Sequence, residues 1–156
     1  MHRIALLALA VCAVAAYPTA ILAGEGGSEN ATACVFTTQL RAENEAPHTS
    51  TSAAFGHTQI KIRNDGTVEW KTEIVNPANE NFFAGHIHEA PAGSAGPVLV
   101  PLFTGPATTD EHITNTGEAA IDPALAADIC ANPQDYYVNY HTNPGFPAGA
   151  IRGQLA

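Results

Sequence analysis

The sequence has few basic side chains. Six lysine and arginine residues face fifteen aspartate and glutamate residues, which gives a formal net charge of −9 at pH 7. An acidic surface repels the phosphates of nucleic acids and anionic membranes, and it attracts cations. We therefore expect no nucleic-acid partner. The partners that remain compatible with this charge are a metal ion and an extracellular protein with a basic face.

After its first residues the chain also lacks the roughly 18 consecutive apolar residues of a membrane helix, so we predict no membrane span. A shorter apolar run covers residues 4–16 behind a basic start and before several small residues. This pattern is typical of a secretory signal peptide, although an uncleaved helix is the alternative. We predict a signal peptide over residues 1–23, cleaved after Ala23 or alternatively after Ala15 or Ala16. The protein is then secreted, to the extracellular space or the periplasm.

Cysteine is scarce. The chain contains three, and Cys12 lies within the predicted signal peptide. The mature chain would keep Cys34 and Cys130, and an even pair in an oxidising compartment indicates one disulfide. Two separate buried thiols are the alternative.

Residues 24–33 are small, polar and without periodicity, as expected of a flexible arm, and residues 34–156 have the length of one domain.

Helical patterns are almost absent. The only helical signal follows Asp122-Pro123, where a capping carboxylate and a first-turn proline predict a short helix near 123–131. The polar segment around His112 is interpreted as a loop or an edge.

The remaining apolar residues follow a two-residue period. This alternation predicts strands, which we place at residues 35–40, 57–63, 67–75, 82–89, 98–103, 136–142 and 150–155. Asn64-Asp65-Gly66 is a tight-turn signal between the second and third of them. We therefore predict an all-β fold, a Greek-key β-sandwich or barrel of about seven to eight short strands.

Histidines provide the clearest candidate site. His86 and His88 flank Ile87, so their side chains share one face of a strand, roughly 6.5 Å apart at their roots, and both can reach one ion. His141 lies in a later predicted strand, before a loop rich in glycine and proline. Three imidazoles without a thiolate favour copper, with zinc as the alternative. Two surface histidines on an alternating strand are the simpler interpretation of the pair alone.

Other polar residues are weaker candidates for this site. Asn139 shares a face with His141 and could orient a ligand or a bound water, whereas Glu89 should point away from the ligands and support them only indirectly. His57 and His48 are possible extra ligands, although solvated surface positions explain them better.

Signals for other chemistry are missing. The chain has no nucleophile elbow, no phosphate-binding glycine loop and no helix-borne zinc motif. The carboxylate pairs Glu43/Glu45 and Asp110/Glu111 are better explained as solvated loop residues than as acid–base groups. The catalytic residues, if the protein is an enzyme, therefore stay unknown.

Several blocks along the chain resemble a known family. Gly85-His86-Ile87-His88, the run 137–142 and the run 151–155 have the order and spacing of the CHRD domain, named after chordin, and the resemblance spans Val35 to Leu155. It implies a secreted, β-sandwich-like domain of poorly defined biochemical role. One reading of it is a protein-binding extracellular module in which the histidines are structural. The family's opening block has a glutamate, a spacer and two prolines, and in Glu45-Ala46-Pro47-His48 a histidine replaces the second proline.

A shorter likeness concerns residues 85–89, which are similar to the copper-binding strand of copper/zinc superoxide dismutases. It implies His86 and His88 as copper ligands, His141 as a third ligand and Arg152 as a possible anion-guiding residue. The zinc ligands of that family have no clear counterpart, so the likeness implies at most a copper-only dismutase, and the acidic surface opposes steering of superoxide. We therefore expect copper handling or redox chemistry outside the cell first, and a copper-dependent dismutase second.

Overall fold

The computed structural model describes residues 30–103 and 105–156. The predicted signal peptide and residues 24–29 of the predicted arm lie outside the described residues. Within them, the strands are β1 (Thr32–Leu40), β2 (Phe55–Arg63), β3 (Thr67–Val75), β4 (Phe82–Glu89), β5 (Val98–Pro101), β6 (His112–Ala120), β7 (Tyr136–Thr142) and β8 (Ile151–Gln154). The other elements are two 3-10 turns, η1 (Ala42–Asn44) and η2 (Pro133–Asp135), and the helix α1 (Pro123–Ala131).

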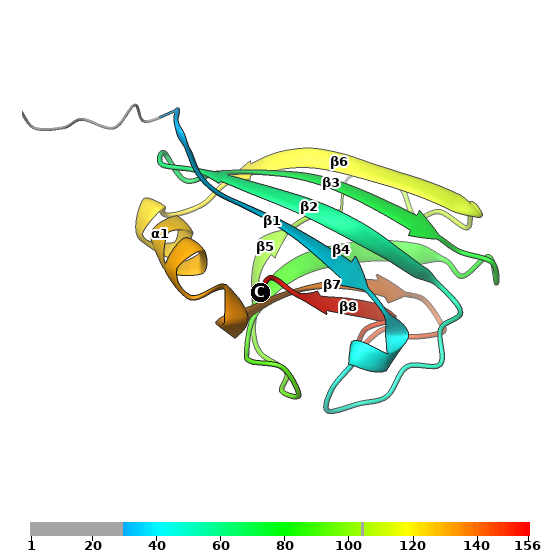
Figure 1. Ribbon diagram of the computed structural model, residues 1–156. Helices are drawn as coiled ribbons and strands as arrows, with labels where there is room; N and C mark the ends of the chain where they lie inside the picture. Colours follow the sequence, from blue (N-terminus) through cyan, green and yellow to red (C-terminus); the bar gives the residue numbers. More distant parts are fainter. Residues whose placement is uncertain (1–29, 104) are drawn as a thin grey trace, which may run out of the picture.

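The strands form two antiparallel sheets packed face to face (Figure 1). One sheet has the order β1-β2-β3-β6, and the other has the order β5-β4-β7-β8. After β3, the chain makes two strands in the second sheet and then returns as β6 beside β3, which is a Greek-key type of connection. The predicted all-β sandwich is confirmed, and the helix covers one end of it (Figure 1).

The core lies between the sheets because each strand turns its apolar residues to one side. It is built from fully buried side chains of both sheets, among them Ile60, Ile62, Val68, Ile87, Val138 and Ile151. A chain of hydroxyl groups also joins the sheets: Tyr140 donates to Thr72 Oγ1 at 2.8 Å, and Thr72 Oγ1 lies 2.7 Å from Thr58 Oγ1. Each buried hydroxyl thus has a partner, as burial requires.

β6 is the strand that the sequence pattern did not predict. Its inward positions include Asn115 and Gly117, where an apolar alternation would show larger side chains. Trp70 on β3 explains both residues. Its indole N–H donates to Asn115 Oδ1 at 2.9 Å, and a Cβ at Gly117 would lie 2.4 Å from the indole ring. The Trp70 ring on β3 therefore fills the space that larger side chains of β6 would otherwise occupy.

The predicted disulfide joins Cys34 on β1 to Cys130 on α1, across a sequence separation of 96 residues. The helix begins as predicted, because the Asp122 carboxylate accepts a hydrogen bond from the Ala124 N–H at 2.7 Å and proline occupies the first turn. Among the described residues, no helix has the length and apolar character needed to cross a membrane.

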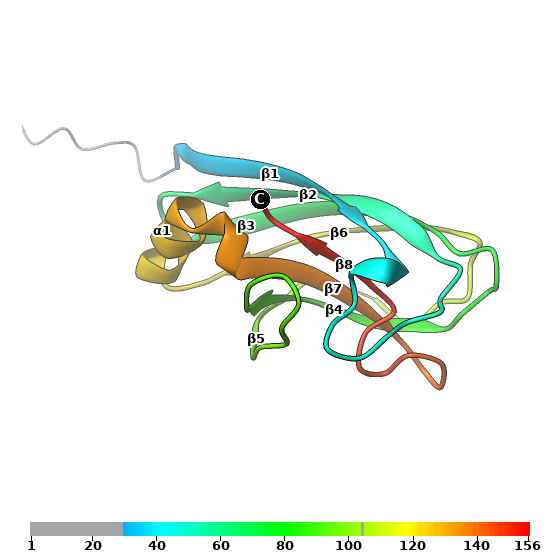
Figure 2. The ribbon, with the colours of Figure 1, turned by 60° about the horizontal axis from the view of Figure 1, so that its bottom comes forward.

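The two faces of the β4–β7 pair differ sharply. Gly85 and Ile87 point into the sandwich, whereas His86 and His88 lie on the outer face. Three loops lie against this outer face, formed by residues 41–54, 90–97 and 143–149. Figure 2 shows the first two of them beyond the β4–β7–β8 sheet, on the side away from the other sheet. The candidate site is therefore outside the core, between a sheet and its covering loops.

Candidate metal centre

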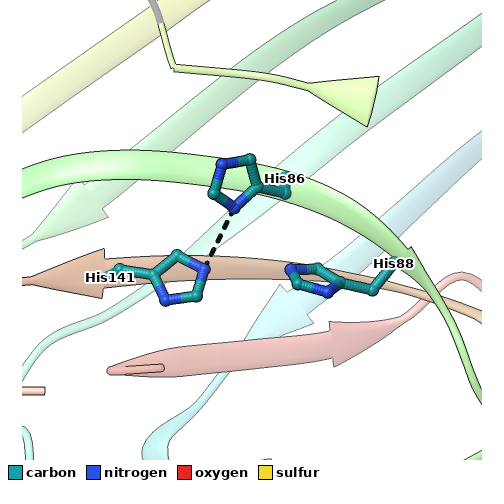
Figure 3. Close-up of side chains that lie close together, drawn as sticks. All are labelled: His86, His88 and His141. Atoms are coloured by element: carbon teal, nitrogen blue, oxygen red, sulfur yellow. Dashed lines mark hydrogen bonds between the residues drawn. The ribbon is translucent and has the colours of Figure 1, made fainter. Parts of the chain in front are cut away.

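The three predicted histidines meet on neighbouring strands. His86 and His88 come from β4, and His141 comes from β7, which pairs with β4 (Figure 3). Gly85 permits this pairing, because a Cβ there would lie 2.5 Å from the Tyr140 ring on the inner face. The Gly-His-Ile-His sequence thus combines close packing on one side of β4 with two imidazoles on the other.

The imidazoles are close enough to share an ion. His86 Nδ1 lies 3.2 Å from His141 Nε2 (Figure 3), and one ligand atom from each of the three histidines lies within 4.8 Å of the others. Two nitrogens at about 2.0 Å from one ion are roughly 3.3 Å apart in tetrahedral geometry. The His86–His141 separation fits this value, and a small shift of His88 would complete a three-nitrogen set.

Backbone carbonyls orient two of the rings. His88 Nδ1 lies 3.0 Å from the Gly96 carbonyl oxygen, and His141 Nδ1 lies 3.2 Å from that of Pro147. A ring that donates from Nδ1 keeps the lone pair on Nε2, which is how metal-binding histidines are usually held. The Nε2 atom of His88 is buried without a hydrogen-bond partner among the described residues. An ion would satisfy this nitrogen.

Burial also keeps the histidines neutral. It lowers the pKa of His86 and of His88, and burial together with the two neighbouring imidazoles lowers the pKa of His141 to about 4. A histidine must be neutral to bind a metal. The lowered pKa values favour the neutral, metal-binding form of all three histidines at neutral pH.

Two other predicted residues lie elsewhere. His57 is on β2, in the opposite sheet, with its Nε2 atom 3.6 Å from Glu73 Oε2. It lies on the outer face of that sheet and does not join the three histidines. Glu89, at the end of β4, is exposed.

Arg152 is buried rather than presented to solvent. Its side chain donates to the carbonyl oxygens of Ala46, Ser94 and Pro91 and to Gln154 Oε1, at 2.7 to 3.3 Å. The residue is 2% exposed.

The guanidinium of Arg152 also lies 3.4 Å from the centre of the Tyr137 ring, and this ring stacks on His88. Arg152 thus fixes two loops and one aromatic ring beside the site. This arrangement leaves little of its charge available to guide an anion.

Asn139 contacts a carboxylate instead of a ligand histidine. It lies opposite His86 in the β4–β7 pairing, and its amide donates to Glu45 Oε2 at 3.3 Å. His48 Nε2 lies at the same distance, 3.3 Å, from that oxygen. His48 is outside the set of three, but its charge contributes to the lowered pKa of His141. Asn139, Glu45 and His48 thus form a polar cluster beside the three histidines.

Glu45 is a functional candidate whose burial was not predicted from the sequence. Its side chain is 0% exposed, whereas the sequence suggested a solvated loop. Burial raises its pKa to about 7, against the smaller effects of the Asn139 hydrogen bond and the Arg152 charge. The only signal was its place in the block Glu45-Ala46-Pro47-His48, because burial of a loop residue depends on contacts distant in sequence.

The raised pKa of Glu45 predicts a pH-dependent cost to stability. An unfolded glutamate ionises near pH 4.5 and Glu45 near pH 7, so the folded state binds more protons between these values and loses stability as pH rises. Glu45→Gln cannot ionise and should be more stable than the wild type at pH 8 by about 3 kcal/mol. At pH 4 the two proteins should be nearly equal. Urea unfolding at both pH values measures the difference, and an equal effect at both would contradict it.

Comparison with known families supports the resemblance seen in the sequence. A family model described as the CHRD domain matches residues 36–155, which is most of the chain. The comparisons with curated proteins and with solved structures gave no match. The matched range includes the three histidines, Cys130 and both sheets except the first residues of β1. The chain therefore belongs to the CHRD domain family.

Proposed function

We propose that this CHRD-domain protein binds one copper ion through His86, His88 and His141, for copper handling or redox chemistry outside the cell. The observation that carries the proposal is the convergence of three imidazole nitrogens within 4.8 Å on the outer face of one sheet. Nitrogen ligands without thiolate suit copper and zinc, and copper binds more tightly than zinc to the same donors. Zinc is therefore the alternative cofactor.

Secretion forms part of the proposal. The Cys34–Cys130 disulfide is typical of oxidising compartments, and the family match agrees with an extracellular type of domain. His86 is the least buried of the three ligands, so small molecules would reach an ion held here from the side of His86. An open position is what separates reactive metal sites from purely structural ones.

Metal analysis tests the proposal directly. The mature protein is incubated with equal concentrations of copper and zinc, passed through a desalting column and analysed, with the His86→Ala/His88→Ala double variant beside it. We expect nearly one copper per wild-type chain and almost none in the variant. Equal metal content in the two proteins, or none in either, would refute the three-histidine site.

A copper-only dismutase is a narrower form of the same proposal. The partial exposure of His86 favours it, whereas the buried Arg152 and the net charge of −9 do not. Copper-loaded protein should consume superoxide in a pulse-radiolysis assay if this form is right. A fully loaded sample without this activity would leave copper handling as the function.

A protein-binding module is supported by a separate feature. The outer face of the other sheet has a cleft of about 300 Å³, bordered by Phe55, His57, Glu73 and His112. Phe55 is 40% exposed, and the Arg41 guanidinium lies 5.4 Å from the centre of its ring, so the cleft offers both apolar and charged groups to a partner. If this is the function, metal-free protein should keep both its melting temperature and its partner binding.

A further inference from the structure

Glu45 is a buried carboxylate that the three-histidine site does not use. We propose that Glu45 is the counter-charge of the cation held by His86, His88 and His141, and that it releases a proton when the cation binds. This inference rests on the proposed metal site and adds a fourth functional residue to it.

Two side chains that contact Glu45 lie near the ligands. Asn139 donates to Glu45 Oε2, and on β7 it lies opposite His86 and two residues before His141, on the same face of the strand. On the other side, His48 Nε2 lies 3.3 Å from the same oxygen, and the charge of His48 affects His141. Glu45 thus contacts two residues that neighbour the ligands, Asn139 by strand register and His48 by the effect of its charge.

The polar cluster is incompletely satisfied. Glu45 Oε1 and Asn139 Oδ1 are buried and have no hydrogen-bond partner among the described residues. Gly149 closes over them, since a Cβ there would lie 2.5 Å from Glu45 Oε2. Buried groups without partners are costly and are retained where function needs them. Balancing the charge of a cation bound to the three histidines would give this cluster such a function.

Charge balance explains why Glu45 would ionise. Three neutral imidazoles bring no negative charge to a divalent cation. Partial burial strengthens the electrostatic interaction between the cation and a nearby charge. The charged groups that face Glu45 are Arg152 on β8 and, when protonated, His48, with Glu43 on the border of the same cleft. Near neutral pH, Glu45 is divided between its protonated and ionised forms. A bound cation favours the ionised form.

Solvent comes close to Glu45 on one side. A cleft of about 320 Å³ is bordered by Glu43, Glu45, Arg152 and Gln154. The step is a simple ionisation, in which the Glu45 carboxyl group loses H⁺ to the buffer and keeps the electron pair of the O–H bond. It needs no oxidant or reductant.

Calorimetric titration with Zn²⁺, which has no redox chemistry, tests the inference at pH 6.5. Titrations in two buffers of different ionisation enthalpy give the number of protons released per ion. The wild type should release about three quarters of a proton more than Glu45→Gln, given a carboxyl pKa of about 7. Glu43→Gln, at an exposed position on the same cleft, is the matched control and should behave as the wild type.

The outcomes separate this inference from the metal site itself. Absence of zinc binding to the wild type would overturn the proposed site and the inference together. Binding with equal proton release in the wild type and Glu45→Gln would overturn the inference alone, as would a loss of the proton in His48→Gln instead. If Glu45→Gln does not fold, ¹³C NMR of the wild-type Glu45 carboxyl carbon replaces it. The signal should move toward the ionised position with zinc, and an unchanged signal would overturn the inference.

Discussion

Replacing His141 by alanine is expected to weaken copper binding by at least about 100-fold. His141 is the only ligand from β7, so its loss leaves two imidazoles on a single strand. Changing a residue that merely supports a metal ligand typically costs 10- to 100-fold in affinity, and removal of the ligand itself should cost more. A competition titration against a chelator of known copper affinity measures the change.

Two histidines on the other sheet provide the matched control. His57 and His112 lie on β2 and β6, away from the three ligands, and their replacement removes an imidazole without touching the site. His57→Ala and His112→Ala should bind copper as the wild type does. If these variants lose as much affinity as His141→Ala, copper binds to surface imidazoles in general and the proposed centre is wrong.

Removal of the disulfide should lower the free energy of unfolding by about 4 kcal/mol. The bond closes a loop across 96 residues of sequence, and in the chain-entropy model a loop of this length restricts the unfolded chain by about that amount. Cys34→Ser/Cys130→Ser replaces both partners and leaves no free thiol to form other bonds. Urea unfolding of the metal-free protein at pH 7 measures the difference.

The reduced wild type is the internal control for this prediction. With a strong reductant, its unfolding midpoint should fall to that of the double variant, because both lack the same link. The helix α1 should unfold with the sandwich in one transition, since Ile129 is fully buried in the core. A double variant as stable as the oxidised wild type would show that the link constrains the unfolded chain very little.

The sequence predicted the strands where a simple alternation governs burial. β2 and β3 were recognisable because their outward residues are polar and their inward residues are apolar, with a tight turn between them. β6 was not, because its inward side accommodates the Trp70 ring with Asn115 and Gly117. The pattern of one strand depends there on a single large side chain of its neighbour, which the local sequence cannot reveal.

The candidate site was predictable to a similar degree. His86 and His88 share a face through the two-residue period alone, but strand register brings His141 to them, since it lies opposite Ala84. Register depends on long-range pairing. The burial of Glu45 depends on loops folding over the outer face of the sheet. The histidines were therefore recognisable from the sequence, whereas Glu45 was expected in solvent.

Because the three histidines lie on the outer face of the sandwich, core packing and the ligand site depend on different residues of the same strands. Alternate residues of β4 hold the protein together, while the residues between them meet the ligand site. Loops tolerate insertions and substitutions far better than a packed interior does. Exposed positions in the segments 41–54, 90–97 and 143–149 can therefore diversify, changing which small molecules reach the three histidines, while Glu45, Gly149 and the framework beneath them stay the same.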